Sequence, residues 1–248
     1  MSGASFLSNR ILSGSSACRI LCMGVLAFVA VPSSARAAEL QPGTMQARVA
    51  ACTGCHGAQG RAGTDGYYPR LAGKPQDYLF QQLIHFRDGS RRYGPMTHLL
   101  TGLPDDYLND IAGWFASQKV PYPAPARSSA SARQLERGRV LAVTGDKARG
   151  LPACVACHGE TLSGALPAIP GLLGLPQDYL VSQLGSWQGG LRHSRPPDCM
   201  ADVARALAPE DLAAVAAWLS VQPVREPYAP MPRGALELPV VCGSQGGE

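Results

Sequence analysis

Two short segments of the chain combine a pair of thiols with an imidazole at the same spacing. Each reads Cys-x-x-Cys-His, the first ending at His56 and the second at His158. On a helical turn both thiols reach one side and can add to the two vinyl groups of a haem. The histidine falls on that side too and can bind the iron, so the spacing predicts two c-type haem sites. The thiols are Cys52 and Cys55 in the first segment and Cys154 and Cys157 in the second.

The two segments are too specific to be accidental. With 8 Cys and 5 His among 248 residues, chance would give about 0.005 such matches. The competing structures are a zinc ribbon built from the four thiols and a pair of disulfides. Neither requires a histidine after both thiol pairs. We therefore expect two covalently bound haem c groups per chain.

A haem iron held by one histidine needs a sixth ligand or keeps an open position. Met96 and Met200 lie at matching places in the two halves, 40 and 42 residues after their histidines. A single methionine is more often a packing residue, but the match between the two halves favours axial ligation. We expect His56 to pair with Met96 and His158 with Met200. Such ligation raises the haem potential and leaves no vacant position for a substrate.

The matching places reflect an internal duplication. The segment around each thiol pair, the sequence Pro-Gln-Asp-Tyr-Leu, one methionine and one tryptophan recur in the same order about 100 residues later. A proline- and serine-rich stretch at 120–131 separates the copies and is typical of an extended linker. We predict one domain at 38–126, a second at 127–223 and a proline-rich tail at 224–248.

Each copy is expected to be mostly helical. Apolar residues at helical spacing predict a helix at 76–87 and its counterpart at 177–187. Acidic residues after a proline predict where the last helix of each copy opens. Short helices at 45–52 and 132–141 should run into the thiol pairs, and the ligand methionines should lie in loops. No alternating strand pattern is evident, so the predicted fold class is all-α.

The first 37 residues have the pattern of a secretory signal peptide. Basic residues precede an apolar run at 20–31 that is short for a membrane span, and Ala-Arg-Ala ends at Ala37. We expect cleavage after Ala37 and a periplasmic protein; a retained N-terminal anchor is the alternative. Loss of this segment lowers the formal charge from +4 to +1. No basic stripe remains that would indicate nucleic-acid binding.

Two cysteines beyond the signal segment are not used by haem attachment. Cys199 lies just ahead of Met200, and Cys242 lies near the end of the tail. The export signal places both in an oxidising compartment. We predict a Cys199–Cys242 disulfide that ties the tail to the second methionine loop; two free thiols or an intermolecular link are the alternatives.

The combined pattern resembles the cytochrome c4 family of bacterial di-haem electron carriers. The resemblance covers about residues 44–222 and rests on CTGCHGAQG with PRLAGKPQDYL in the first copy and CVACHGETLSG with PGLLGLPQDYL in the second. It implies two tandem class I cytochrome c domains that transfer single electrons. The donor would be a quinol-oxidising complex or a dehydrogenase, and the acceptor a terminal oxidase or a reductase. Any membrane association would be peripheral and through these partners.

The resemblance also implies roles for residues around the iron ligands. In such proteins a loop proline commonly offers its carbonyl to the other ring nitrogen of the ligand histidine. Pro69 and Pro170, 13 and 12 residues after their histidines, stand at the corresponding places. Arg91, Arg92 and Arg192 are candidates to face the haem propionates, but our default interpretation of them is solvated surface charge.

The cysteine pair and the long tail depart from the usual family pattern. They leave two further hypotheses open. The chain could be a tightly bound di-haem subunit of a periplasmic dehydrogenase, or a di-haem enzyme that uses the Cys199 thiolate as a soft ligand near the second haem. We favour a carrier without enzymatic activity, because Met200 matches Met96 without any contribution from Cys199.

Overall fold

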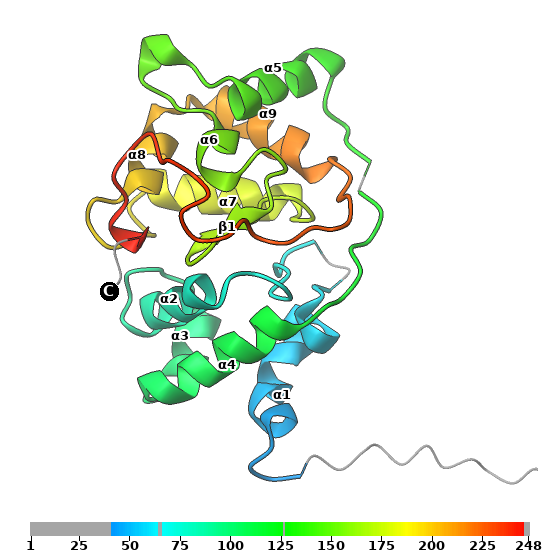
Figure 1. Cartoon of the computed structure of the whole chain (residues 1–248), viewed down its shortest axis with the longest axis vertical. Helices are drawn as coiled ribbons and strands as arrows, with labels where there is room; N and C mark the ends of the chain where they lie inside the picture. The colour runs from blue at the N-terminus through cyan, green and yellow to red at the C-terminus, as the bar shows by residue number, and fades with distance from the viewer. Residues whose placement is uncertain (1–40, 64–65, 126, 246–248) are drawn as a thin grey trace, which may run out of the picture. The chain divides into compact units, whose positions relative to one another are not determined.

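The two sequence repeats form two sets of helices in the computed structural model, which describes residues 41–63, 66–125 and 127–245. We call them the first lobe and the second lobe, and both belong to one compact unit (Figure 1). The first lobe contains α1 (Met45–His56), α2 (Gln76–Arg87), α3 (Gly94–Leu100) and α4 (Asp105–Ser117). The second lobe contains α5 (Ala132–Val143), α6 (Cys154–His158), α7 (Gln177–Gln188), α8 (Cys199–Ala206) and α9 (Pro209–Ser220).

Other regular structure in the described residues is short. Strands β1 (Gly164–Ala165) and β2 (Ile169–Pro170) form one antiparallel pair in the second lobe. Single turns of tighter helix occur at η1 (Ala58–Gly60), η2 (Lys147–Arg149) and η3 (Gly243–Gln245). The all-α class predicted from the sequence is confirmed by this helix-dominated content.

Each lobe has its own buried core. In the first lobe α2 packs on α4 around Leu79, Ile111 and Phe115. In the second lobe α5 packs on α9, and a Cβ atom at Gly138 would lie only 2.1 Å from the carbonyl oxygen of Ala214. Glycine is therefore required where these two helices cross. The predicted domain boundary near 126 falls on a residue outside the described part of the chain.

Local signals explain where several helices begin. The side chains of Thr44 and Ser131 accept hydrogen bonds from the first turns of α1 and α5, as N-cap residues do. Asp105 and Asp106 lie in the first turn of α4, where carboxylates interact favourably with the helix dipole. Asp198 caps α8 in the same way as Ser131 caps α5.

Two local expectations are wrong. The two methionines predicted to bind iron, Met96 and Met200, lie within the short helices α3 and α8 rather than in loops. In the second lobe the helix ends at Val143 and does not run into the thiol pair, which lies on the separate helix α6. Gly145, with a φ of 75°, turns the chain out of α5, and a bridge between Asp146 and Leu151 closes the loop that follows.

Candidate haem-binding sites

The residues predicted to bind two haems line one continuous cavity between the lobes. The cavity walls include one cysteine of the first thiol pair, both of the second pair, both histidines and both methionines. These residues are Cys52, His56, Met96, Cys154, Cys157, His158 and Met200. Cys55 does not line the cavity and is exposed on α1 between Cys52 and His56. The structure thus places all four predicted iron ligands on the walls of one cavity, together with three of the four predicted haem-attachment cysteines.

Each histidine is held by the loop proline that follows it. The Nδ1 atom of His56 lies 2.9 Å from the carbonyl oxygen of Pro69, and that of His158 lies 2.8 Å from the carbonyl oxygen of Pro170. A carbonyl can only accept, so Nδ1 carries the proton and donates, and Nε2 keeps its lone pair. That tautomer is the one that can bind an iron.

Burial keeps both imidazoles neutral. His56 and His158 are each 7% exposed. Burial lowers the pKa of His56, against a raising effect of the Pro69 hydrogen bond. Burial lowers the pKa of His158 to about 4, Pro170 opposes this, and the charge of Lys74 adds to it. A neutral imidazole is the form that a metal requires.

The cavity walls away from these ligands are largely apolar. In the first lobe they include Leu79, Phe86 and Ile111, and in the second Leu180 and Leu219. Such walls suit the face of a porphyrin and exclude water from it. They also explain how a chain with only 6% aromatic residues builds two cores, since a large apolar cofactor completes each of them.

Two arginines meet where the lobes touch. Arg91 and Arg192 form an antiparallel backbone bridge and are 7% and 5% exposed. The interpretation of these two residues as solvated surface charge is therefore wrong. Residues from both repeats bury these two arginines, so the sequence of one repeat could not have indicated their burial.

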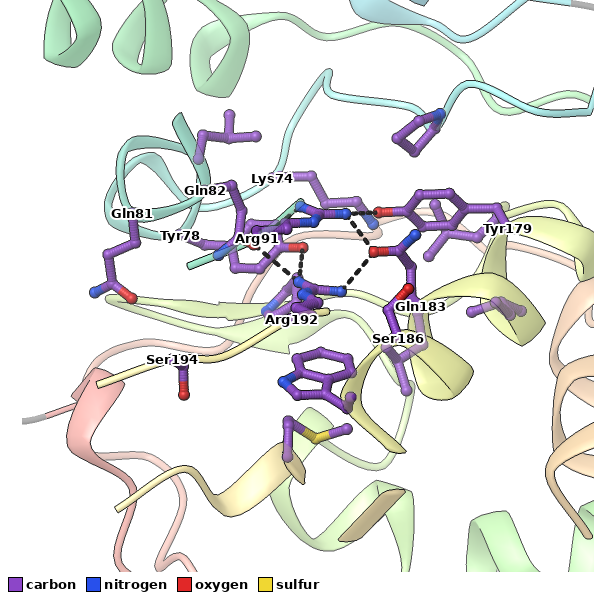
Figure 2. A pocket seen from close by; sticks show the side chains of 18 of the residues that line it. Lys74, Tyr78, Gln81, Gln82, Arg91, Tyr179, Gln183, Ser186, Arg192 and Ser194 are labelled. Atoms are coloured by element: carbon purple, nitrogen blue, oxygen red, sulfur yellow. Dashed lines mark hydrogen bonds between the residues drawn. The ribbon is translucent and has the colours of Figure 1, made fainter. Parts of the chain in front are cut away.

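The two guanidinium groups share neutral partners from both lobes (Figure 2). Arg91 donates to the side-chain oxygens of Gln82 at 2.9 Å and Gln183 at 2.5 Å, and to the Tyr179 hydroxyl at 3.0 Å. Arg192 donates to Gln183 at 3.0 Å and to Gln82 at 2.8 Å. Each glutamine therefore accepts from one arginine of each repeat, which joins the lobes through an approximately symmetric network.

The buried cations in this region have no carboxylate partner among the described residues. Arg91, Arg192 and Lys74 take part in none of the ion pairs found there. Burial, followed by repulsion from a neighbouring arginine, lowers the pKa of Arg192 to about 10 and that of Lys74 to about 7. Buried charge of this kind calls for an anion. Haem propionates are carboxylates, so the residues present fit the group.

The sequence contained a signal for this network that motif reasoning missed. Tyr78, Gln82 and Arg91 recur as Tyr179, Gln183 and Arg192 at a constant offset of 101 residues. When the same residue types recur at equivalent repeat positions outside the haem-binding motif, they are expected to have the same structural role in both repeats. Lys74 gives no such signal, since Leu175 stands at its repeat position.

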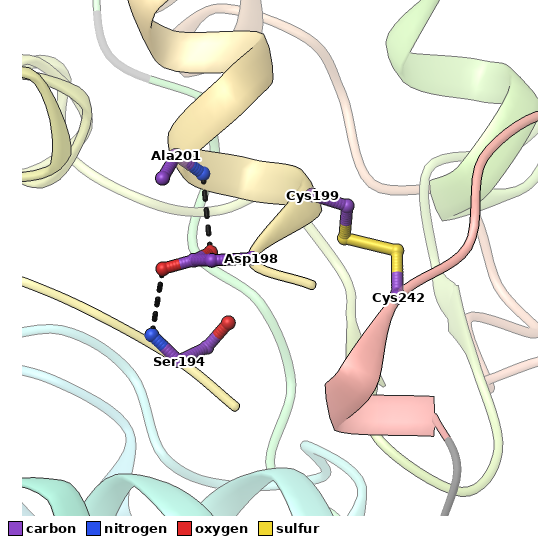
Figure 3. Close-up of a disulfide and its surroundings, with 5 residues drawn as sticks. All are labelled: Ser194, Asp198, Cys199, Ala201 and Cys242. Carbon is purple, nitrogen blue, oxygen red and sulfur yellow. Dashed lines mark hydrogen bonds between the residues drawn. A yellow bond between two sulfur atoms is a disulfide. The ribbon is translucent and has the colours of Figure 1, made fainter. Parts of the chain in front are cut away.

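The structure joins Cys199 to Cys242 in a disulfide (Figure 3). Cys199 is the first residue of α8, immediately before Met200. The carboxylate of Asp198 accepts from the backbone N–H groups of Ser194 at 2.7 Å and Ala201 at 3.1 Å. The start of the methionine helix is thus held by a side-chain cap and by the bridge to the tail.

The tail is attached to the second lobe at further points. The Tyr228 hydroxyl donates to the carbonyl oxygen of Leu162 and accepts from the N–H of Leu173. The backbone of Met231 pairs with that of Gly164 and Leu166, at N···O distances of 2.9 and 2.8 Å. The tail therefore contacts the loop that follows His158 as well as the helix that carries Met200.

We predict that the double variant Cys199→Ser/Cys242→Ser keeps both haems but unfolds at lower denaturant concentration. The bridge closes a loop with a sequence separation of 43 residues, and a cross-link of this kind contributes about 2–4 kcal/mol. Guanidinium titration under non-reducing conditions measures the difference in free energy of unfolding between the variant and the unmodified protein. Met231→Ala, which changes a side chain of the tail but keeps the bridge, is the control. Two alkylatable thiols in the freshly isolated oxidised protein would contradict the bridge.

No helix in the described part of the chain is long and apolar enough to cross a membrane. The segment predicted to be a signal peptide, residues 1–37, lies outside the described residues.

No family model matches the chain, but individual proteins do. A thiosulfate dehydrogenase electron acceptor of Thiomonas intermedia is 35% identical over 209 residues, covering 83% of this chain and 92% of the relative. Cytochrome c4 of Pseudomonas aeruginosa is 35% identical over 176 residues, covering 70% of this chain and 85% of the relative.

Solved structures show the same similarity. Reduced cytochrome c4 from Pseudomonas stutzeri superposes with a TM-score of 0.62 at 31% identity, covering 71% of this chain and 95% of that chain. Thiosulfate dehydrogenase TsdBA from Marichromatium purpuratum gives a TM-score of 0.63 at 35% identity. The match covers 70% of this chain but only 36% of that longer chain. The chain is an electron carrier with two covalently bound haem c groups. It belongs to the cytochrome c4 family.

Proposed function

We propose that this protein is a periplasmic carrier that accepts single electrons from a thiosulfate-oxidising dehydrogenase and passes them to a downstream redox protein. The observation that carries the proposal is the match to the Thiomonas electron acceptor, which extends over 83% of the chain. The match to cytochrome c4 of Pseudomonas aeruginosa covers 70%. The similarity to part of TsdBA supports the same donor class. It also supports the second hypothesis, a subunit that stays bound to its dehydrogenase.

In this proposal each lobe holds one haem through its own thiol pair. Cys52 and Cys55 attach the first haem, and Cys154 and Cys157 attach the second. The axial pairs are His56 with Met96 and His158 with Met200. When bound, the haem supplies reversible one-electron chemistry at its iron.

The remaining chemistry belongs to the chain itself. The carbonyl oxygens of Pro69 and Pro170 hold the Nδ1 proton of each histidine, at 2.9 and 2.8 Å, and so orient Nε2. The apolar walls exclude water from the site, which lowers the reorganisation that accompanies a change of charge. Arg91 and Arg192 provide the positive charge that haem carboxylates require.

Neither haem iron binds a substrate in this function. Cys199, the residue that the enzyme hypothesis needs as a thiolate, is bonded to Cys242 in the structure. A disulfide sulfur is not available as a thiolate ligand. We infer that the chain is a carrier without enzymatic activity. Its signal peptide directs it to the periplasm and is cleaved after Ala37. The predicted domains at 38–126 and 127–223 then each correspond to one haem unit.

The donor can be tested by mixing the oxidised holoprotein with thiosulfate and a thiosulfate dehydrogenase. We expect reduction of both haems, followed by stopped-flow absorbance, only when enzyme and thiosulfate are both present. Cytochrome c4 of Pseudomonas aeruginosa serves as the comparison protein and should be reduced more slowly. No reduction by the dehydrogenase, together with rapid reduction by a quinol-oxidising complex, would overturn the proposed donor.

A further inference from the structure

Lys74 of the first lobe is buried against the second lobe. It precedes α2 and is 4% exposed, and its Nζ donates a hydrogen bond to the carbonyl oxygen of Gly171. Gly171 follows Pro170, whose own carbonyl oxygen holds His158. The ammonium group of one lobe therefore lies beside the loop that orients the predicted iron-ligand histidine of the other lobe.

This contact has no counterpart at the first site. The repeat position of Lys74 is Leu175, which is apolar and 8% exposed. The cation that acts electrostatically on His56 is Arg91, which already has three neutral side chains as partners. Lys74 thus places a charge beside the second haem site, and the equivalent position of the other repeat carries no charge.

We propose that Lys74 is a positioning residue that raises the reduction potential of the second haem by placing a positive charge beside the His158 loop. A haem iron that takes up one electron, passing from ferric to ferrous, loses one positive charge. A nearby cation therefore disfavours the oxidised form and stabilises the reduced form. In a water-excluded site this interaction is stronger than at the surface. Lys74 thus shifts an electron shared by the two haems toward the second haem.

The effect can be measured by spectroelectrochemical titration of the holoprotein at pH 6. The Met96→Ala background is used, because its Met–iron charge-transfer band then reports only the second haem. Lys74→Gln removes the charge but keeps a donor for Gly171, and Lys74→Met removes both. Lys74→Arg keeps the charge. Lys147→Met removes an exposed charge from the second lobe as a matched control.

We expect Lys74→Gln and Lys74→Met to lower the equilibrium constant for reduction of the second haem by about threefold to tenfold. Tenfold corresponds to about 59 mV for one electron. Lys74→Arg and Lys147→Met should leave it unchanged. A purely structural role predicts rescue by Lys74→Gln, and that outcome, or an unchanged potential in both neutral variants, would overturn the proposal. The titration uses redox mediators, so it does not depend on which protein is the natural donor.

Discussion

Replacing Cys154 and Cys157 with alanine together should leave a protein with one covalent haem instead of two. The thioether bonds of the second lobe cannot form without these sulfurs, while the first thiol pair is unchanged. The apolar walls of the second site then lose the cofactor that fills them, and that lobe should become less stable. The ratio of haem to protein, from a pyridine haemochrome assay on chains matured in a host that attaches haem c, measures the change.

The matched variant Cys52→Ala/Cys55→Ala should give the same ratio with the remaining haem in the second lobe. Cys199→Ser/Cys242→Ser removes two cysteines as well and should retain both haems. If the Cys154/Cys157 variant kept two covalent haems, the assignment of the second attachment site would be wrong.

Substituting either ligand methionine should change one haem and spare the other. In Met96→Ala the first haem, and in Met200→Ala the second, is expected to lose its Met–iron charge-transfer band and become high-spin or bind another ligand. Loss of the thioether should also lower the potential of that haem, by on the order of 0.1 V. Absorption spectra and redox titrations of the two variants measure both effects.

Met231→Ala is the control for the methionine variants. Met231 lies in the tail, where its backbone pairs with Gly164, and its replacement should preserve both bands. If Met200→Ala left both haems unchanged while Cys199→Ala altered one, the second iron would be bound through Cys199. The enzyme hypothesis would then replace the carrier.

The parts of the fold that follow from local sequence were predictable. The range 76–87 coincides with α2, because a proline before the helix and apolar residues at helical spacing fix both its start and its buried face. The duplication likewise indicated that α7 would repeat α2. These elements carry their own signals, independent of the rest of the molecule.

The short methionine helices could not be predicted in the same way. The seven-residue helix α3 has one buried residue, Leu100, and no periodic pattern. Met96, Leu99 and Leu100 of this helix line the cavity, so its position depends on tertiary packing rather than on local sequence. Helix α8 depends on a cap from Asp198 and on the Cys199 bridge, and the second of these joins segments 43 residues apart.

The haem-binding motifs were readable because covalent chemistry fixes their spacing, whereas the contacts between the lobes are not fixed by spacing. Arg91 and Arg192 become buried only because the two lobes pack against each other at these residues. The contact between Lys74 and Gly171 joins residues 97 positions apart. A solvated arginine and a buried one look alike in a sequence, and only the packing of the lobes distinguishes them.

The intact mass of the purified protein under denaturing conditions shows whether one chain carries two covalently attached haems. We expect the mass of residues 38–248 plus two haems, with no haem removed by acid acetone. A mass that corresponds to one haem, or to the bare chain with extractable haem, would contradict it.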